Sequence, residues 1–368
     1  MAGKVKLGII GVGQIGKSHI KRYSEIPDAQ IVAVADINEE EAKRVAAANN
    51  IPHVFTNFHD LLKMDEIVAV DVCLHNNFHA PITIHALEAG KDVYCEKPMA
   101  GAYIDAKQMY DTAKRLKRKL SIQLSTLFAI ETKAAKRLIA DGHLGKIYYA
   151  KSSAYRRRGR PYVDGYGTSS FVQKKTAAGG ALYDMGVYHI AQVLYLLGNP
   201  AVEAVSGATH QEIDMYEDRR KKGGYDVEEL GIGLIRLGGG ITFFLEESWA
   251  IHLGGTDGSK ICGSKGGVSL SPLAYFSAMS DMSMNSSFDL SAADTRWHSC
   301  FPETSAYDSP QHHWIAVQQG RVPLIDTAGI ALNTMKISEG IYLSSKKGKE
   351  VTGSQIEKAS KSTAIKGL

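Results

Sequence analysis

The stretch Gly11-Val-Gly13-Gln-Ile-Gly16 decides the fold class of this chain. It directly follows an apolar run, residues 5–10, that predicts a buried strand, and it opens an amphipathic segment, residues 15–26, that predicts a helix. The glycines permit a tight turn, close packing of helix on strand, and approach of a pyrophosphate to the free N–H groups at the helix N-terminus. The stretch therefore predicts the phosphate-binding turn of a dinucleotide site.

A carboxylate ends the next predicted strand. Asp36 follows the run 30–35, about 20 residues after Gly16, where a carboxylate accepts hydrogen bonds from the adenosine ribose hydroxyls. It also repels a 2′-phosphate, although Lys43 or Arg44 on the following segment could bend toward one. The sequence therefore predicts NAD as the cofactor and makes NADP less favoured.

The first 125 residues alternate strand-like and helix-like segments. Such alternation predicts a parallel, doubly wound sheet, so we expect a dinucleotide-binding Rossmann domain at residues 1–125. Beyond it, β-rich runs are interspersed with a few helical segments, which predicts an α+β domain at residues 126–368 for substrate binding and oligomerisation. We expect its sheet to be large, open and mainly antiparallel, with a loop or lid at 277–294 and a mobile tail at 354–368.

Bulk composition excludes several classes of function. The 368 residues carry a net charge of +4, which is too small an excess to indicate a nucleic-acid partner. No segment approaches the roughly 20 apolar residues of a membrane helix, and the first ten residues do not resemble a signal peptide. Four widely spaced cysteines lack metal-knuckle spacing. We expect a cytoplasmic protein that binds small molecules and has no metal site.

Two further clusters carry chemistry. Glu96-Lys97-Pro98 follows the predicted strand 92–95 and so lies at the carboxyl edge of the sheet, where ligands bind in this fold. A lysine there, near a positive nicotinamide ring, can have a lowered pKa and can hold or deprotonate a substrate hydroxyl. In the second cluster, Asp184 and Tyr188 are four residues apart and share a helix face, with His189 beside them. This pattern fits proton transfer, or a tyrosine and a histidine that merely pack in the core.

Together these clusters resemble the glucose-fructose oxidoreductase, inositol dehydrogenase and rhizopine-catabolism family, called Gfo/Idh/MocA. The glycine turn, the Glu-Lys-Pro tripeptide and Gly-Gly-x-x-x-Asp-x-Gly at 179–186 all match, and the resemblance runs from Lys6 to about Val351. It implies a Rossmann domain, an open-sheet domain that often makes dimers or tetramers, and hydride exchange with sugars or cyclitols. It also implies that Lys97 and Asp184 belong to the active site, and that an Asn-x-x-His pair, here Asn76 and His79, touches the cofactor.

This sequence departs from the family pattern at two points. Tyr188 stands where many members have histidine, with His189 one residue later, so the general base stays open between Tyr188, His189 and Lys97. Leu127-Phe128 replaces an Arg-Phe pair, so a contact of that arginine must come from elsewhere. The predicted catalytic residues are Lys97, Asp184, Tyr188 and His189, and the predicted cofactor-binding residues are Gly11, Gly13, Gln14, Ile15, Gly16, Asp36, Asn76, His79, Glu96 and Lys97.

The resemblance and the three clusters predict an NAD(P)-dependent oxidoreductase that exchanges hydride with a secondary alcohol of a sugar, glycoside or cyclitol, working as a homo-dimer or homo-tetramer. Two alternatives stay open. The aromatic segment 155–171 would suit a redox glycosidase or glycoside 3-oxidase that retains and recycles NAD, and a catalytically idle sugar sensor is disfavoured by the intact Lys97 and Asp184. Arginines 156, 157, 158 and 160 could bind an acidic substrate or form a solvated basic loop.

Overall fold

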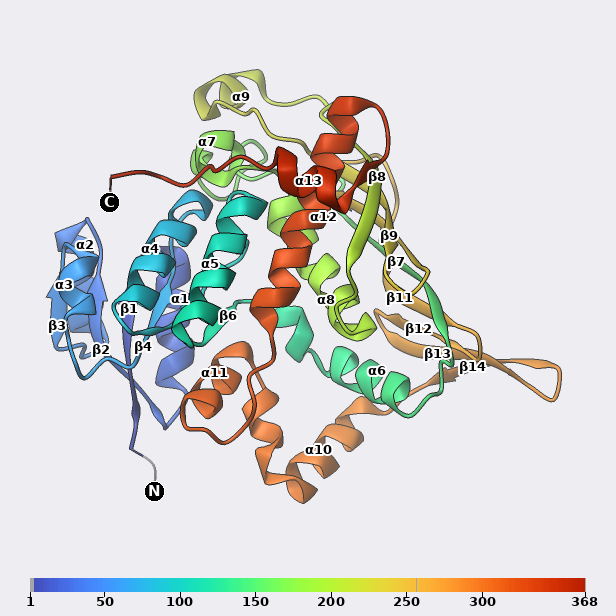
Figure 1. Cartoon of the computed structure of the whole chain (residues 1–368), viewed down its shortest axis with the longest axis horizontal. Helices are drawn as coiled ribbons and strands as arrows, with labels where there is room; N and C mark the ends of the chain where they lie inside the picture. The colour runs from blue at the N-terminus through green and yellow to red at the C-terminus, as the bar shows by residue number, and fades with distance from the viewer. Residues whose placement is uncertain (1–2, 256, 368) are drawn as a thin grey trace.

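The structure, a computed structural model, describes residues 3–255 and 257–367 and contains two sheets with helices around them (Figure 1). The first sheet confirms the predicted Rossmann fold. Its six parallel strands lie in the order β3-β2-β1-β4-β5-β6, so the strand order reverses between β1 and β4. The strands are β1 (Val5–Ile10), β2 (Ala29–Ala35), β3 (His53–Phe55), β4 (Ala69–Val72), β5 (Asp92–Cys95) and β6 (Leu120–Ile122).

Helices connect these strands as the alternating pattern predicts. Both faces of the sheet are covered, so strand residues such as Leu7 and Ile9 are fully buried. The carboxyl ends of β1 and β4 then flank the crevice at which doubly wound sheets bind ligands. The helices are α1 (Gln14–Ser24), α2 (Glu39–Ala48), α3 (Phe58–Leu62), α4 (Asn76–Glu88) and α5 (Tyr103–Leu116).

The second sheet confirms the predicted open, mainly antiparallel architecture. Its order is β14-β13-β12-β11-β7-β10-β9-β8-β15, and β7 and β10 are the one parallel pair among the described strands of this sheet. Gly239 and Gly240 adopt positive φ in the β9–β10 hairpin, where glycine is favoured. The strands are β7 (Ile147–Tyr155), β8 (Val202–His210), β9 (Leu230–Leu237), β10 (Ile241–Ser248), β11 (Gly258–Gly263), β12 (Gly267–Leu270), β13 (Leu273–Met279), β14 (Met282–Ser287) and β15 (Val351–Thr352).

One face of this sheet packs on helices. Helix α12 (Thr327–Lys347) contacts β8 on one side and α5 and β6 of the Rossmann fold on the other, so it lies between the two sheets in Figure 1. The remaining helical segments are η1 (Ser125–Phe128), α6 (Ile130–Ala140), η2 (Ser169–Val172), α7 (Lys174–Ala177), the π-helix η3 (Leu182–Gly186), α8 (Val187–Leu197), α9 (Glu217–Gly223), α10 (Leu290–Cys300), η4 (Pro302–Tyr307), α11 (Pro310–Gln318) and α13 (Gly353–Ala359).

The predicted domain boundary after residue 125 stays a prediction, because the chain crosses between the two sheets more than once. Helix α11 lies far beyond residue 125 in sequence, yet its Trp314 and Ile315 are buried in one cluster with Leu7 and Ile9 of β1. The two halves therefore share apolar contacts, which hold α11 against the Rossmann sheet.

Two sequence expectations are wrong. Residues 277–294 were expected to form a loop, but they continue the β13–β14 hairpin and begin α10. The edge strand β14 has no buried residue, so it tolerates the Ser and Asn that suggested a loop. The expected mobile tail forms α13 behind a capping box and then crosses α4 and α5, where the Thr363 N–H donates to Asp105 (2.9 Å) and the Ile365 N–H to the Asn77 carbonyl (3.1 Å). No helix in the described ranges is long and apolar enough to cross a bilayer.

Candidate active site

The glycine turn after β1 has the geometry that its sequence predicts. Gly11 has φ +94°, and a Cβ there would lie 2.4 Å from the Cys73 carbonyl oxygen, so the turn itself demands glycine. At Gly16 a Cβ would lie 2.1 Å from the Gly11 carbonyl oxygen, so α1 packs on β1 at a distance that excludes any side chain. These two glycines are explained by contacts within the chain.

Gly13 is different, and it provides the test of fit for the dinucleotide. A Cβ at this position would meet no atom of the described chain within 4 Å. Gly13 is the N-cap of α1, which has no side-chain cap and no acidic residue in its first turn, and Ile15 beside it is exposed. Free N–H groups at a positive helix end, with open space before them, fit a pyrophosphate. The residues Gly11, Gly13, Gln14, Ile15 and Gly16 would hold it there.

Asp36 at the end of β2 is oriented toward the same turn. Its carboxylate accepts hydrogen bonds from the N–H groups of Val12 and Asn38, both at 2.9 Å. The neighbouring Ile37 is 94% exposed, which leaves an apolar surface for an adenine ring. The position fits the adenosine ribose of NAD.

The basic residues beside Asp36 are already paired. Lys43 contacts Glu39 (2.7 Å), and the Arg44 guanidinium donates twice to Glu41, both bonds at 2.8 Å. Both are exposed surface ion pairs and compete only weakly with a 2′-phosphate, so the predicted preference for NAD over NADP rests on Asp36.

Lys97 and Asp184 meet across the two halves of the protein. Lys97 follows β5 at the carboxyl edge of the Rossmann sheet, whereas Asp184 lies in the π-helix η3 before α8, and π-helical turns often mark functional sites. The Lys97 ammonium lies 3.1 Å from Asp184 Oδ1 and donates to the Asp184 carbonyl at 2.9 Å. The predicted pair of active-site residues is thus in direct contact.

Trp249, which follows β10, completes this contact. Its indole N–H donates to Asp184 Oδ2 at 3.0 Å, so both carboxylate oxygens are held. Burial alone would raise the pKa of Asp184, but Lys97 and the Trp249 hydrogen bond hold that pKa below its ordinary value. Sequence reasoning missed Trp249. Its position at the end of a predicted strand of the second domain was the one available signal.

The charge state of Lys97 differs from the sequence expectation of a lowered pKa. Burial alone would lower it, but Asp184, Tyr188 and Glu96 outweigh burial and raise the pKa of Lys97 to about 12. Lys97 is therefore an ammonium ion in this state, suited to hold a hydroxyl oxygen by donating to it.

The structure separates the roles of Tyr188 and His189. The Lys97 ammonium lies 4.8 Å from the centroid of the Tyr188 ring, so Tyr188 belongs to the Lys97–Asp184 cluster. Burial raises the pKa of Tyr188 above its ordinary value, and Lys97 opposes that rise without cancelling it. His189 instead places Nδ1 2.8 Å from Glu247 Oε1 on β10, and this carboxylate outweighs burial and raises the pKa of His189.

Asn76 and His79 have partners within the chain. The Asn76 amide donates to the Ala177 carbonyl (2.6 Å), which ties α4 to α7 of the second half. His79 is fully buried, with Nδ1 2.7 Å from the Pro98 carbonyl oxygen and Nε2 3.0 Å from that of Leu74. His79 thus braces the loop that carries Lys97, and its contact with the cofactor stays a prediction.

Among the arginines of the segment 155–171, Arg160 is not available to a ligand. Arg160 is fully buried, and its guanidinium binds Asp164 (2.8 Å) and Glu229 (2.9 Å), so it cannot take an acidic substrate. Arg156 binds the hydroxyl of Tyr166 and lies close enough to Asp184 to contribute to its lowered pKa. Arg156 therefore lies near the Lys97–Asp184 contact.

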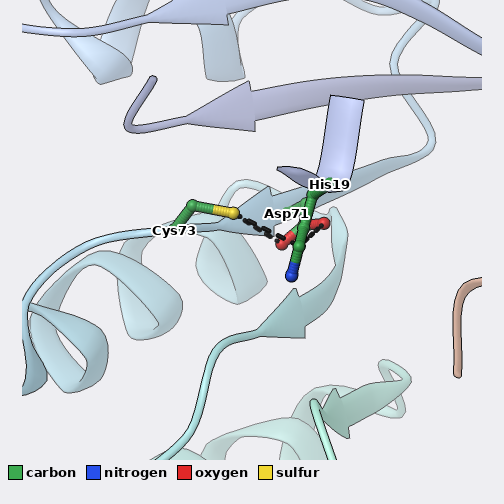
Figure 2. Close-up of side chains that lie close together, drawn as sticks. All are labelled: His19, Asp71 and Cys73. Atoms are coloured by element: carbon green, nitrogen blue, oxygen red, sulfur yellow. Dashed lines mark hydrogen bonds and ion pairs between the residues drawn. The ribbon is translucent and has the colours of Figure 1, made fainter. Parts of the chain in front are cut away.

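A buried group beside Glu96 was also missed by the sequence analysis. His19, Asp71 and Cys73 place three potential ligand atoms within 4.8 Å of one another, an arrangement that can hold a metal ion in some proteins (Figure 2). Figure 2 shows the thiol of Cys73 and the imidazole of His19 both directed at the Asp71 carboxylate. Their hydrogen bonds decide what this group does, as described below.

Asp36 allows a test of cofactor choice. We expect Asp36→Ser to weaken NAD binding about tenfold, because charge-assisted hydrogen bonds to the ribose are lost, and to narrow the gap to NADP because the repulsion of its 2′-phosphate disappears. Fluorescence titration with NADH and NADPH measures both affinities. Lys43→Ala is the control and should leave the ratio of affinities unchanged. An unaltered NADH-to-NADPH ratio in Asp36→Ser would contradict the assignment.

Comparison with known proteins agrees with this geometry. The oxidoreductase family with an NAD-binding Rossmann fold, GFO/IDH/MocA, matches residues 5–124, and the C-terminal domain of that family matches residues 132–269. D-glucoside 3-dehydrogenase of Escherichia coli (strain K12) is 33% identical over 276 residues, which covers 73% of this chain and 77% of that protein. Myo-inositol 2-dehydrogenase of Thermotoga maritima is 24% identical over 264 residues, covering 72% and 74%.

A solved structure extends the likeness to the whole fold. Levoglucosan dehydrogenase, in complex with NADH and levoglucosan, aligns with a TM-score of 0.78 at 21% identity, covering 96% of this chain and all of that one. The glycine turn, the Lys97–Asp184 contact and the matches to both family domains lead to one conclusion. The chain is a member of the Gfo/Idh/MocA family of oxidoreductases, with the NAD-binding Rossmann fold of that family.

Proposed function

We propose that this protein oxidises a ring secondary alcohol of a glucoside, at carbon 3, with NAD as the acceptor. The observation that carries the proposal is the Lys97–Asp184 contact at the carboxyl edge of the Rossmann sheet, because it places an ammonium and a fixed carboxylate where this fold binds ligands. The name of the E. coli relative, a D-glucoside 3-dehydrogenase, supports the substrate class and the carbon.

Different residues of this chain would bind different hydroxyls of the substrate. Bound NAD would accept a hydride from the carbinol carbon. The Lys97 ammonium donates to the hydroxyl oxygen of that carbon, and Asp184, held by Trp249, accepts from a neighbouring hydroxyl. Two adjacent ring hydroxyls would thus be hydrogen-bonded by two groups of opposite charge.

We assign proton removal to Tyr188. The Lys97 ammonium lies 4.8 Å from the centroid of the Tyr188 ring and opposes the rise in the pKa of Tyr188 that burial causes. Asp184 stabilises the ammonium form of Lys97 and so disfavours Lys97 as a base. His189 is bound to Glu247 and is the alternative acceptor.

Substrate-dependent reduction of NAD tests the function. We expect reduced nicotinamide to accumulate with an alkyl glucoside but not with myo-inositol, and we expect Lys97→Met to lower kcat/KM about 100-fold or more because the hydroxyl loses its donor. Absorbance of the reduced nicotinamide measures both, and the melting temperature checks folding. Full turnover by Lys97→Met would contradict the proposal.

The same absorbance measurement distinguishes the alternative functions. Product formation by tightly bound cofactor without net reduction would identify a redox glycosidase or a self-contained oxidase, and glucoside binding without any absorbance change would identify a sensor. If NAD were reduced with myo-inositol but not with the glucoside, the proposed substrate class would change from glucosides to cyclitols.

A matched pair of variants identifies the base. We expect Tyr188→Phe to lower kcat roughly 100-fold or more, because the proton acceptor is removed while the ring and its contact with Lys97 remain. The control is His189→Asn, whose amide can replace Nδ1 in the bond to Glu247 while the Nε2 position is lost. It should keep kcat within about tenfold. The opposite ranking in initial-rate measurements would transfer the role to His189.

We also propose that the open face of the second sheet pairs with a second copy, giving a homo-dimer or homo-tetramer. Leu234 and Phe244 are directly paired on this face, and Phe276 lies on the same face, while the helices cover the opposite one. Exposed apolar side chains on an open sheet favour association.

Sedimentation measures this association. We expect a dimer or larger species, and dissociation in Leu234→Arg/Phe276→Arg, because two buried charges would face each other across the contact. Tyr148→Arg, at an exposed position on the alternate side of β7, is the control and should leave the mass unchanged. A monomeric wild-type protein would contradict the proposal.

A further inference from the structure

A buried ionic bridge joins His19 to Asp71 and to Glu96, the residue before Lys97. His19 on α1 is only 1% exposed, and its two ring nitrogens meet carboxylates on opposite sides. Nδ1 lies 2.8 Å from Asp71 Oδ2 on β4, and Nε2 lies 2.8 Å from Glu96 Oε1 directly after β5. One side chain of the first Rossmann helix therefore joins the carboxyl ends of two central strands.

The hydrogen bonds define the charge of the ring. An ionised carboxylate can only accept a hydrogen bond. His19 can donate to both Asp71 and Glu96 only when both ring nitrogens carry a proton, which is the imidazolium form. Burial alone would lower the pKa of His19, but the Asp71 carboxylate beside Nδ1 opposes burial, and the pKa of His19 is raised well above its ordinary value. Burial likewise would raise the pKa of Glu96, but His19 and Lys97 hold it below its ordinary value.

The same bonds argue against a metal at the group in Figure 2. A metal needs an unprotonated ring nitrogen and, from cysteine, a thiolate. Both nitrogens of His19 are occupied by carboxylates, and burial, followed by the charge of Asp71, raises the pKa of the Cys73 thiol. The group is a hydrogen-bonded clamp.

The clamp reaches Lys97 through Glu96. Glu96 Oε2 accepts a hydrogen bond from the Lys97 backbone N–H at 2.9 Å, while its Oε1 is held by His19. The backbone N–H of Glu96 donates to the Val72 carbonyl at 3.0 Å, so the strand itself is fixed independently. The side chain of Glu96 is thus the link between α1 and the backbone of the loop that carries Lys97.

We propose that His19 is a positioning residue for Lys97: by holding the Glu96 carboxylate, it fixes the Lys97 ammonium relative to the dinucleotide-binding helix α1. The kinetic consequence rests on the proposed function of Lys97, whereas the structural consequence does not. A displacement of about 1 Å in a group that aligns a substrate can lower turnover about 100-fold.

Two substitutions separate the two bonds that His19 makes, one to Asp71 and one to Glu96. His19→Asn places an amide near the Nδ1 position and keeps the bond to Asp71, whereas His19→Gln places one near Nε2 and keeps the bond to Glu96. Both remove the charge and both should lower the melting temperature. We expect kcat to fall roughly 10- to 100-fold in His19→Asn, with little change in the KM for NAD, and to stay within about threefold of wild type in His19→Gln. Equal kcat values at comparable stability would overturn the proposal.

Amide hydrogen exchange supplies a readout that needs no activity. We expect the Lys97 amide to exchange faster in His19→Asn than in His19→Gln, while the Glu96 amide, bonded to Val72, stays protected in both. Unchanged Lys97 exchange would refute the clamp even if no glucoside is ever turned over. Absence of wild-type turnover would refute only the proposed function.

A variant of the link itself covers the case in which His19→Asn does not fold. Glu96→Asp keeps the charge but shortens the side chain by one methylene, so it cannot span His19 and the Lys97 N–H together. It should reproduce the faster Lys97 exchange and the loss of kcat. Wild-type behaviour of Glu96→Asp in both measurements would overturn the proposal.

Discussion

The contact between Lys97 and Asp184 is where the two halves of this protein meet chemically. Each side chain comes from a different sheet system, and each is charged in a partly buried place, so neither would be stable there without the other. The Trp249 indole N–H donates to the second carboxylate oxygen of Asp184, and the Glu96 carboxylate accepts from the Lys97 backbone N–H. The pair therefore joins the two halves at the carboxyl edge of the Rossmann sheet.

The rest of the architecture brings groups to that point. Parallel strands end at one edge of the sheet, so the glycine turn after β1, Asp36 after β2 and Lys97 after β5 share that edge although they are distant in sequence. The apolar contacts of Trp314 and the position of α12 between the sheets hold the second half against it. His19 and His79 then brace the Lys97 loop from within the Rossmann fold.

Sequence patterns predicted the groups whose positions depend on residues nearby in the chain. The spacing of Gly11, Gly13 and Gly16 and the position of Asp36 follow from a turn and two strands, and the structure agrees with both. Partners such as Trp249 for Asp184 and Glu247 for His189 come from distant strands, and no periodicity reports which strands become neighbours. The raised pKa of Lys97 is a result of such a contact. The β13–β14 hairpin and the C-terminal segment were missed because polar sequences resemble loops until their backbone partners are known.

The central claim is that the Lys97–Asp184 site removes hydride from one ring carbon of a glucoside. Its most direct test is a single turnover with an alkyl glucoside deuterated at carbon 3, followed by mass measurement of the isolated reduced nicotinamide. The account predicts that the deuterium is found in the nicotinamide ring and that the transfer shows a primary isotope effect. Reduced cofactor that carries no deuterium would contradict oxidation at carbon 3, and no reduced cofactor at all would contradict the claim that this site dehydrogenates glucosides.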